Sequence, residues 1–157
     1  MPRALSDYLV PQEGLDLQKA LSSWGWLVPG AFTVWLISRI ADMFLVLPDG
    51  SVLMLDVGGG TLARVADSRD DFAAKLDGPG NADDWLAVPL IDKCVAEGLM
   101  LAKGQCYGFV QPPVLGGDYT PENLRPIDLV DYVGAYGTLH EQIRDLPDGT
   151  EVVLRPS

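Results

Sequence analysis

Hydrophobic and polar positions follow several different periods along the chain, and the first thirty residues follow a helical one. Apolar side chains recur there three or four residues apart, and Pro29–Gly30 ends the region. From Phe32 onward the pattern changes to continuous apolar runs, which are typical of buried strands. The sequence therefore predicts a helical N-terminal segment followed by a sheet.

A β-hairpin is predicted where two apolar runs, 43–47 and 52–55, flank the sequence Pro48-Asp49-Gly50-Ser51. Proline presets the backbone for a turn, and the glycine accepts a positive φ. Three glycines at 58–60 predict a second reversal, which leads into a third antiparallel strand at 61–65.

Helix start signals follow at two places. Ser68 can accept a hydrogen bond from the backbone amide of Asp71, whose carboxylate can reach back, so we expect a helix to begin there. Asn81 and the acids after it repeat this arrangement before a second apolar stripe. Pro89 lies inside that stripe and predicts a kink or a new helix start.

The final third of the chain is predicted to hold strands at 99–101 and 106–110 and then a long helix. Apolar residues recur at helical spacing from Ile127 to Leu146, which corresponds to about five turns. A turn at 147–150 precedes a last predicted strand at 152–154. The expected fold class is α+β, with an antiparallel sheet built from hairpins and packed against several helices, including the long C-terminal one.

The length indicates how many domains the chain forms, and the charge narrows the possible partners. The 157 residues suit one domain, with possible sub-lobes at 1–80 and 81–157. The 22 acidic and 11 basic residues leave a formal charge of −11, which repels phosphate backbones and anionic membranes. We therefore expect neither nucleic acid nor a membrane as partner, whereas a basic protein fits this charge.

The two cysteines, Cys94 and Cys106, form neither a disulfide framework nor a metal-ligand cluster. Both lie among apolar or small residues, so we expect reduced, buried thiols. The first residues lack the apolar core of an export signal. These features predict a cytoplasmic protein.

Two patterns suggest enzyme chemistry. The run from Gly58 to Ala63 has the spacing G-x-G-x-x-A of dinucleotide-binding loops and follows an apolar strand. That chemistry needs a helix beginning at the glycines, whereas the helix start signal comes later, at Ser68, which favours a plain turn. His140 is the single histidine, and no nucleophile motif accompanies it, so a structural role is favoured. We expect no catalytic residue, cofactor or metal.

Acidic residues open the two middle helices and line the last one. Helix capping and a solvated surface account for them, but a docking surface for a cationic protein is the second interpretation. The candidate partner-binding residues are Asp70, Asp71, Asp83, Asp84, Asp131, Glu141 and Asp145.

Several stretches together resemble one family of small bacterial proteins. Residues 41–56 are similar to its "GD-x-F…DG-x-V…LD" hairpin. Residues 104–109, and then 113–119 with Asn123, are similar to its "P-x-L-G-G-x-Y…N" loop, and 139–150 resemble its closing helix and turn. The family comprises the type VI secretion immunity proteins that neutralise DNase toxins, specifically their C-terminal domain. The resemblance covers roughly residues 30 to 154, after a shortened counterpart of the GAD-like domain that often comes first.

This resemblance implies a non-enzymatic protein that binds and blocks a toxin, which is expected to be a basic nuclease. Two alternatives remain open: a nucleotide-dependent enzyme that uses the turn from Gly58 to Ala63, and an adaptor without a toxin partner. The residues assigned to the structural motif are Gly50, Gly116, Gly117, Tyr119, Asn123 and Gly149.

Overall fold

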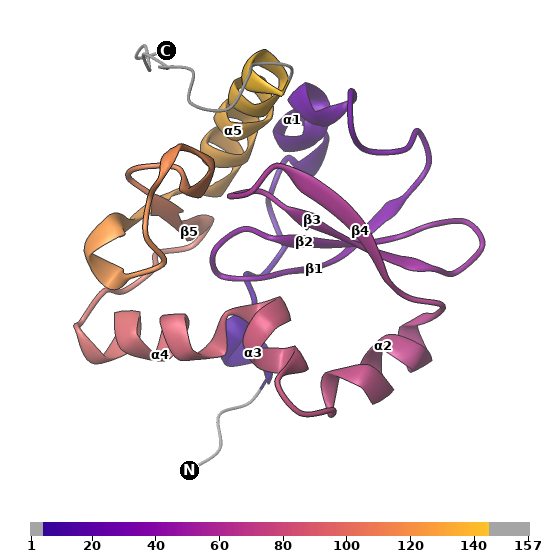
Figure 1. Cartoon of the computed structure of the whole chain (residues 1–157), viewed down its shortest axis with the longest axis horizontal. Coiled ribbons are helices and arrows are strands. Elements are labelled where there is room, and N and C mark those ends of the chain that lie inside the picture. The colour runs from indigo at the N-terminus through magenta and orange to yellow at the C-terminus, as the bar shows by residue number, and fades with distance from the viewer. Residues whose placement is uncertain (1–4, 145–157) are drawn as a thin grey trace.

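A computed structural model describes residues 5–144 of the chain. A four-stranded sheet lies in the middle of the molecule (Figure 1). The first and last described α-helices lie side by side at one end of it, and three further α-helices line the opposite side. The predicted α+β class is confirmed.

The sheet is antiparallel throughout, in the order β1-β2-β3-β4. Its strands are β1 (Thr33–Ile37), β2 (Met43–Val46), β3 (Val52–Asp56) and β4 (Thr61–Ala66). The predicted hairpin is confirmed, since Gly50 has a φ of +90° in the β2–β3 turn and Leu47 donates to the carbonyl of Ser51. The second glycine reversal also joins antiparallel strands, because Asp56 pairs with Thr61.

The helical N-terminal segment is present but consists of short pieces. They are η1 (Leu5–Tyr8), α1 (Leu17–Leu21) and η2 (Ser22–Trp24). Buried Trp24 donates from its indole to the backbone oxygen of Val133 at 2.8 Å, and Ser23 donates to that of Gly134 at 2.7 Å. This segment is therefore attached directly to the last helix.

Three helices follow β4: α2 (Arg69–Leu76), α3 (Asn81–Leu86) and α4 (Val88–Ala96). Ser68 caps α2 as predicted, by accepting from the amide of Asp71 at 2.9 Å. The predicted cap at Asn81 is wrong, because its side chain donates to the carbonyl of Lys75 and so closes the end of α2 instead. The predicted break at Pro89 is confirmed as a new start, since proline stands in the first turn of α4, where it costs no helical hydrogen bond.

The last part pairs β5 (Gln105–Phe109) with β6 (Leu124–Asp128), and α5 (Leu129–Ile143) follows directly. Two short turns of helix, η3 (Pro113–Leu115) and η4 (Pro121–Asn123), lie between these strands. The long helix was expected to begin at Ile127, but Ile127 belongs to β6 and pairs with Cys106. The strand predicted at 99–101 is also wrong, because those residues form a loop in which Leu99 and Leu101 pack against the core. The turn at 147–150, with Gly149, and the strand at 152–154 lie outside the described residues.

Candidate partner-binding surface

The single histidine lies inside the fold rather than in a cleft. His140 is 3% exposed, and its Nε2 lies 2.8 Å from the carbonyl oxygen of Val57, to which it donates. The backbone amide of Val57 in turn donates to Oδ1 of buried Asp42 at 3.0 Å. The rings of Trp24 and Tyr136 lie 5.6 and 5.9 Å from the imidazole. Both polar side chains therefore hold the backbone where β3 turns into β4.

Burial favours the neutral form of both side chains. It raises the pKa of Asp42 well above its ordinary value, and the charge of Asp56 adds to this effect. It also lowers the pKa of His140, although the hydrogen bond to Val57 opposes the change. A buried imidazole that donates to a backbone carbonyl has a structural role in this arrangement.

The glycine run from Gly58 to Ala63 lies in the wrong context for a nucleotide. It joins two antiparallel strands, and α2 begins only at Arg69. Gly60 has a φ of +72°, and a Cβ there would overlap the His140 ring, so this glycine serves the packing of the turn on α5. The dinucleotide geometry, a helix N-terminus facing the glycines, is absent from this part of the described chain.

Both thiols are buried and unreactive. Burial raises the pKa of Cys94 to about 11 and that of Cys106 further still. Among residues 5–144, no three His, Cys, Asp or Glu side chains are placed to hold a metal ion. No described helix is long and apolar enough to cross a bilayer.

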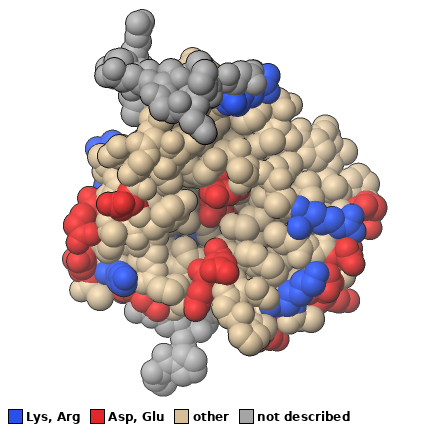
Figure 2. Space-filling view, in the orientation of Figure 1, with Lys and Arg blue, Asp and Glu red and all other residues tan. Residues whose placement is uncertain are grey.

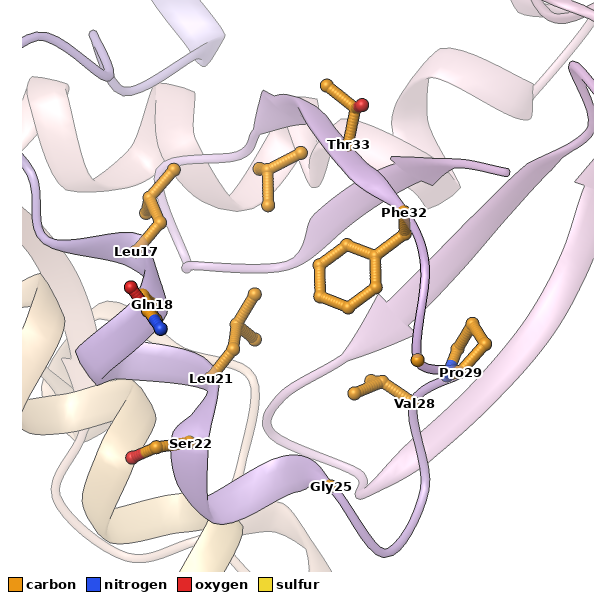
Figure 3. A pocket seen from close by; sticks show the side chains of 11 residues that line it. Leu17, Gln18, Leu21, Ser22, Gly25, Val28, Pro29, Phe32 and Thr33 are labelled. Atoms are coloured by element: carbon orange, nitrogen blue, oxygen red, sulfur yellow. The ribbon is translucent and has the colours of Figure 1, made fainter. Parts of the chain in front are cut away.

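A groove of about 770 Å³ runs between α1, η2 and the start of β1. Figure 3 shows Leu17, Leu21, Val28 and Phe32 along its walls, with the amide of Gln18 at one side. Its lining contains no charged or nucleophilic group other than the hydroxyls of Ser22 and Thr33. The groove therefore offers apolar contact but no catalytic chemistry.

The candidate acids fall into two groups on different helices. Asp70, Asp83 and Asp84 are exposed at the starts of α2 and α3, whereas Asp131 and Glu141 are exposed on α5. In Figure 1, α2 and α5 lie on opposite sides of the molecule. Figure 2 shows carboxylates at the margins and in the middle of one face.

The other two candidate acids stand apart from these groups. The carboxylate of Asp71 accepts from the amide of Asp67 at 2.8 Å and pairs with Lys75 at 3.1 Å, so it already serves α2. These contacts lower the pKa of Asp71, and the hydrogen bond from the Asp67 amide contributes most. Asp145 lies outside the described residues.

The loop of residues 110–119, which we call the Tyr119 loop, is held in one shape by Asn123. The Asn123 amide accepts from the backbone N–H of Gln111 at 2.8 Å and donates to the carbonyls of Gln111 and Asp118, both at 2.9 Å. Gly116 has a φ of +94°, which glycine alone adopts at little cost. Gly117 lies directly against the Gln111 carbonyl, which a Cβ at this position would overlap, so a larger residue does not fit there.

Three of the large side chains in this loop are exposed to solvent. Val110 is 56% exposed, Val114 44% and Tyr119 53%. The Tyr119 ring packs edge-on against Phe109 at 5.0 Å between centroids. Partial burial and the charges of Asp56 and Asp42 raise the pKa of Tyr119 to about 12. Sequence reasoning placed Tyr119 in the structural motif and did not single out Val110 or Val114, because their exposure depends on how the loop folds.

Comparison with known families adds an independent finding. Residues 66–140 match the family described as "T6SS immunity protein Tdi1, C-terminal", where T6SS is the type VI secretion system. The predicted resemblance to type VI secretion immunity proteins is confirmed over this segment. The matched segment contains the Tyr119 loop and His140, whereas the hairpin at 41–56 precedes it. No curated protein matches the chain.

Proposed function

We propose, from the match of residues 66–140 to the type VI secretion immunity family, that this chain neutralises a nuclease toxin by binding it. This match is the observation that carries the proposal. The chain would act as a stoichiometric inhibitor without catalysis of its own, inside the cell that it protects.

Three features of the site support a non-enzymatic role. His140 donates to a backbone carbonyl and is buried, so it is not placed to exchange protons with a substrate. Burial keeps both thiols protonated at neutral pH. The glycine turn packs on His140 and leaves no room for a phosphate group at Gly60.

The net charge of −11 supports a basic partner. A nuclease toxin is expected to be basic, because it must itself bind the phosphate backbone of DNA. The exposed acids at Asp70, Asp83 and Asp84, or those at Asp131 and Glu141, are proposed to steer this partner during encounter. Because the two groups lie on different sides of the molecule, we expect one of them to face the toxin.

The proposal is tested by expressing each reading frame that adjoins this chain's gene, alone and together with the chain. We expect the toxin alone to degrade cellular DNA and stop growth, and co-expression to restore growth. The matched control is Trp24→Asp, which places a charge in the core and removes the donor to Val133, so it should not protect.

Two results would contradict the proposal. A toxin that remains lethal beside a folded, abundant wild-type chain would leave the adaptor interpretation. A thermal stabilisation by NAD or NADP that Gly60→Val abolishes would instead support the nucleotide-dependent enzyme.

A further inference from the structure

The Tyr119 loop exposes three large side chains to solvent, and no described contact covers their exposed parts. Val110, Val114 and Tyr119 lie within ten residues of each other and are each 44% exposed or more. Several exposed large side chains on one short loop favour a contact surface more than isolated ones do. Tyrosine is also among the residues that contribute most to binding energy in interfaces.

The loop is shaped before any partner arrives. Asn123 holds both ends through three hydrogen bonds, and Gly117 sits directly against the Gln111 carbonyl. The Phe109 ring packs against the Tyr119 ring. The backbone of Phe109 is itself anchored, because its carbonyl accepts from the hydroxyl of Tyr136 at 3.0 Å. A side chain held in this way loses little conformational entropy on binding.

The surroundings of Tyr119 are negatively charged. Asp118 precedes it in the chain and is exposed, and the charge of Asp56 reaches the phenol from the β3–β4 turn. Gly58 of that turn lies against Phe109 and Pro113, which places the turn beside the loop. An aromatic face next to carboxylates binds a cationic side chain through ring and charge together.

We propose that the Tyr119 loop is the surface that anchors the toxin, with Tyr119 and Val114 contacting a basic segment of the toxin and Asp118 pairing with one of its cations. This inference rests on the proposed function and names the part of the chain that performs it. The acids on α2, α3 and α5 then act at longer range and contribute to encounter.

The test measures binding of the toxin that the co-expression experiment identifies, in a catalytically inactivated form. We expect Tyr119→Ala to raise the Kd at least about thirtyfold, the change typical of a hot-spot residue. Val114→Asp should weaken binding similarly, since an apolar contact is lost. Tyr119→Phe keeps the ring and should retain most of the affinity. Met100→Ala is the matched control, because Met100 is 82% exposed outside the loop and should change the Kd less than about twofold.

Each outcome has one meaning when melting temperatures confirm that the variants are folded. Wild-type chain that binds and protects, together with Tyr119→Ala and Val114→Asp that bind equally well, would overturn the loop assignment and leave the proposed function intact. Wild-type chain that does not bind the toxin would overturn both. A wild-type dimer that Tyr119→Ala converts to a monomer, with toxin binding unchanged, would assign the loop to self-association instead.

Discussion

Asp42 and His140 hold the two polar backbone groups of the same residue, Val57. The aspartate accepts from its amide at 3.0 Å, and the imidazole donates to its carbonyl at 2.8 Å. Asp42 precedes β2 and His140 lies near the end of α5, so one residue connects the hairpin sheet to the last helix. Since buried backbone groups must be paired, this residue makes the position of the β3–β4 turn depend on α5.

Replacing His140 by phenylalanine should lower the free energy of unfolding by about 1–3 kcal/mol at pH 7.5, because the buried Val57 carbonyl loses its donor. The deficit should shrink as the pH falls. Burial lowers the pKa of His140 from its ordinary 6.5, so its contribution is complete above pH 6.5 and is lost as the pH falls toward the lowered value.

Urea titrations of wild type and His140→Phe at pH 7.5 and 5 check this prediction. The raised pKa of Asp42 acts in the opposite direction, stabilising at low pH and losing this effect as the pH rises. Because Asp42 is present in both proteins, its effect cancels in their difference. A deficit that stays constant or grows on acidification would contradict the assignment. Glu141→Gln, on the exposed side of the helix, should change little.

Alanine substitutions at two glycines with positive φ distinguish the cost of backbone strain from the cost of steric overlap. Gly50→Ala should cost about 1–2 kcal/mol, since φ is +90° there but a Cβ meets nothing. Gly60→Ala has φ +72° and also overlaps His140, which should add about 1–3 kcal/mol. Melting curves of both variants measure the two losses of stability, and the loss at Gly60 should be the larger. Equal losses would mean that the turn does not pack on the histidine as described.

We propose that the chain unfolds as one domain, because the N-terminal segment is hydrogen-bonded to α5 through Trp24 and Ser23. Tryptophan fluorescence and far-UV circular dichroism should therefore report the same urea midpoint. Two separated transitions would instead divide the chain into sub-lobes near residue 80. Ser23→Ala should lower the common midpoint without splitting it.

Salt should act on how fast the toxin binds. The Debye length falls from about 8 Å at physiological ionic strength to about 3 Å at 1 M, so the association rate should drop steeply while dissociation changes less. Comparing Asp83→Asn/Asp84→Asn with Asp131→Asn/Glu141→Gln shows which group of acids faces the toxin. Association that is insensitive to salt and to both double variants would leave the net charge as a solubility feature.

Local signals in the sequence predicted the hairpins and the start of α2 correctly, because Gly50 and Ser68 act on residues within a few positions of themselves. Errors arose where partly buried apolar residues lie in a different kind of structure from the one that their spacing indicates. Leu99 and Leu101 pack against the core from a loop, and Ile127 continues a helical spacing although it pairs in β6. Periodicity alone does not separate these cases.

The candidate surface was less accessible to prediction than the fold. The motif around Gly116, Gly117 and Asn123 is readable in the sequence, but the exposure of Val114 results from hydrogen bonds that form only in the folded loop. Contacts between distant residues, such as that of His140 with Val57 across 83 positions, likewise have no local signal.

Whether this chain blocks a toxin by binding it is measured by titrating the toxin's nuclease activity with purified wild-type chain. We expect DNA cleavage to fall linearly and to cease at one equivalent of the wild-type chain, and the Tyr119→Ala variant to require a large excess. Cleavage that continues unchanged in excess wild-type chain would contradict inhibition by binding.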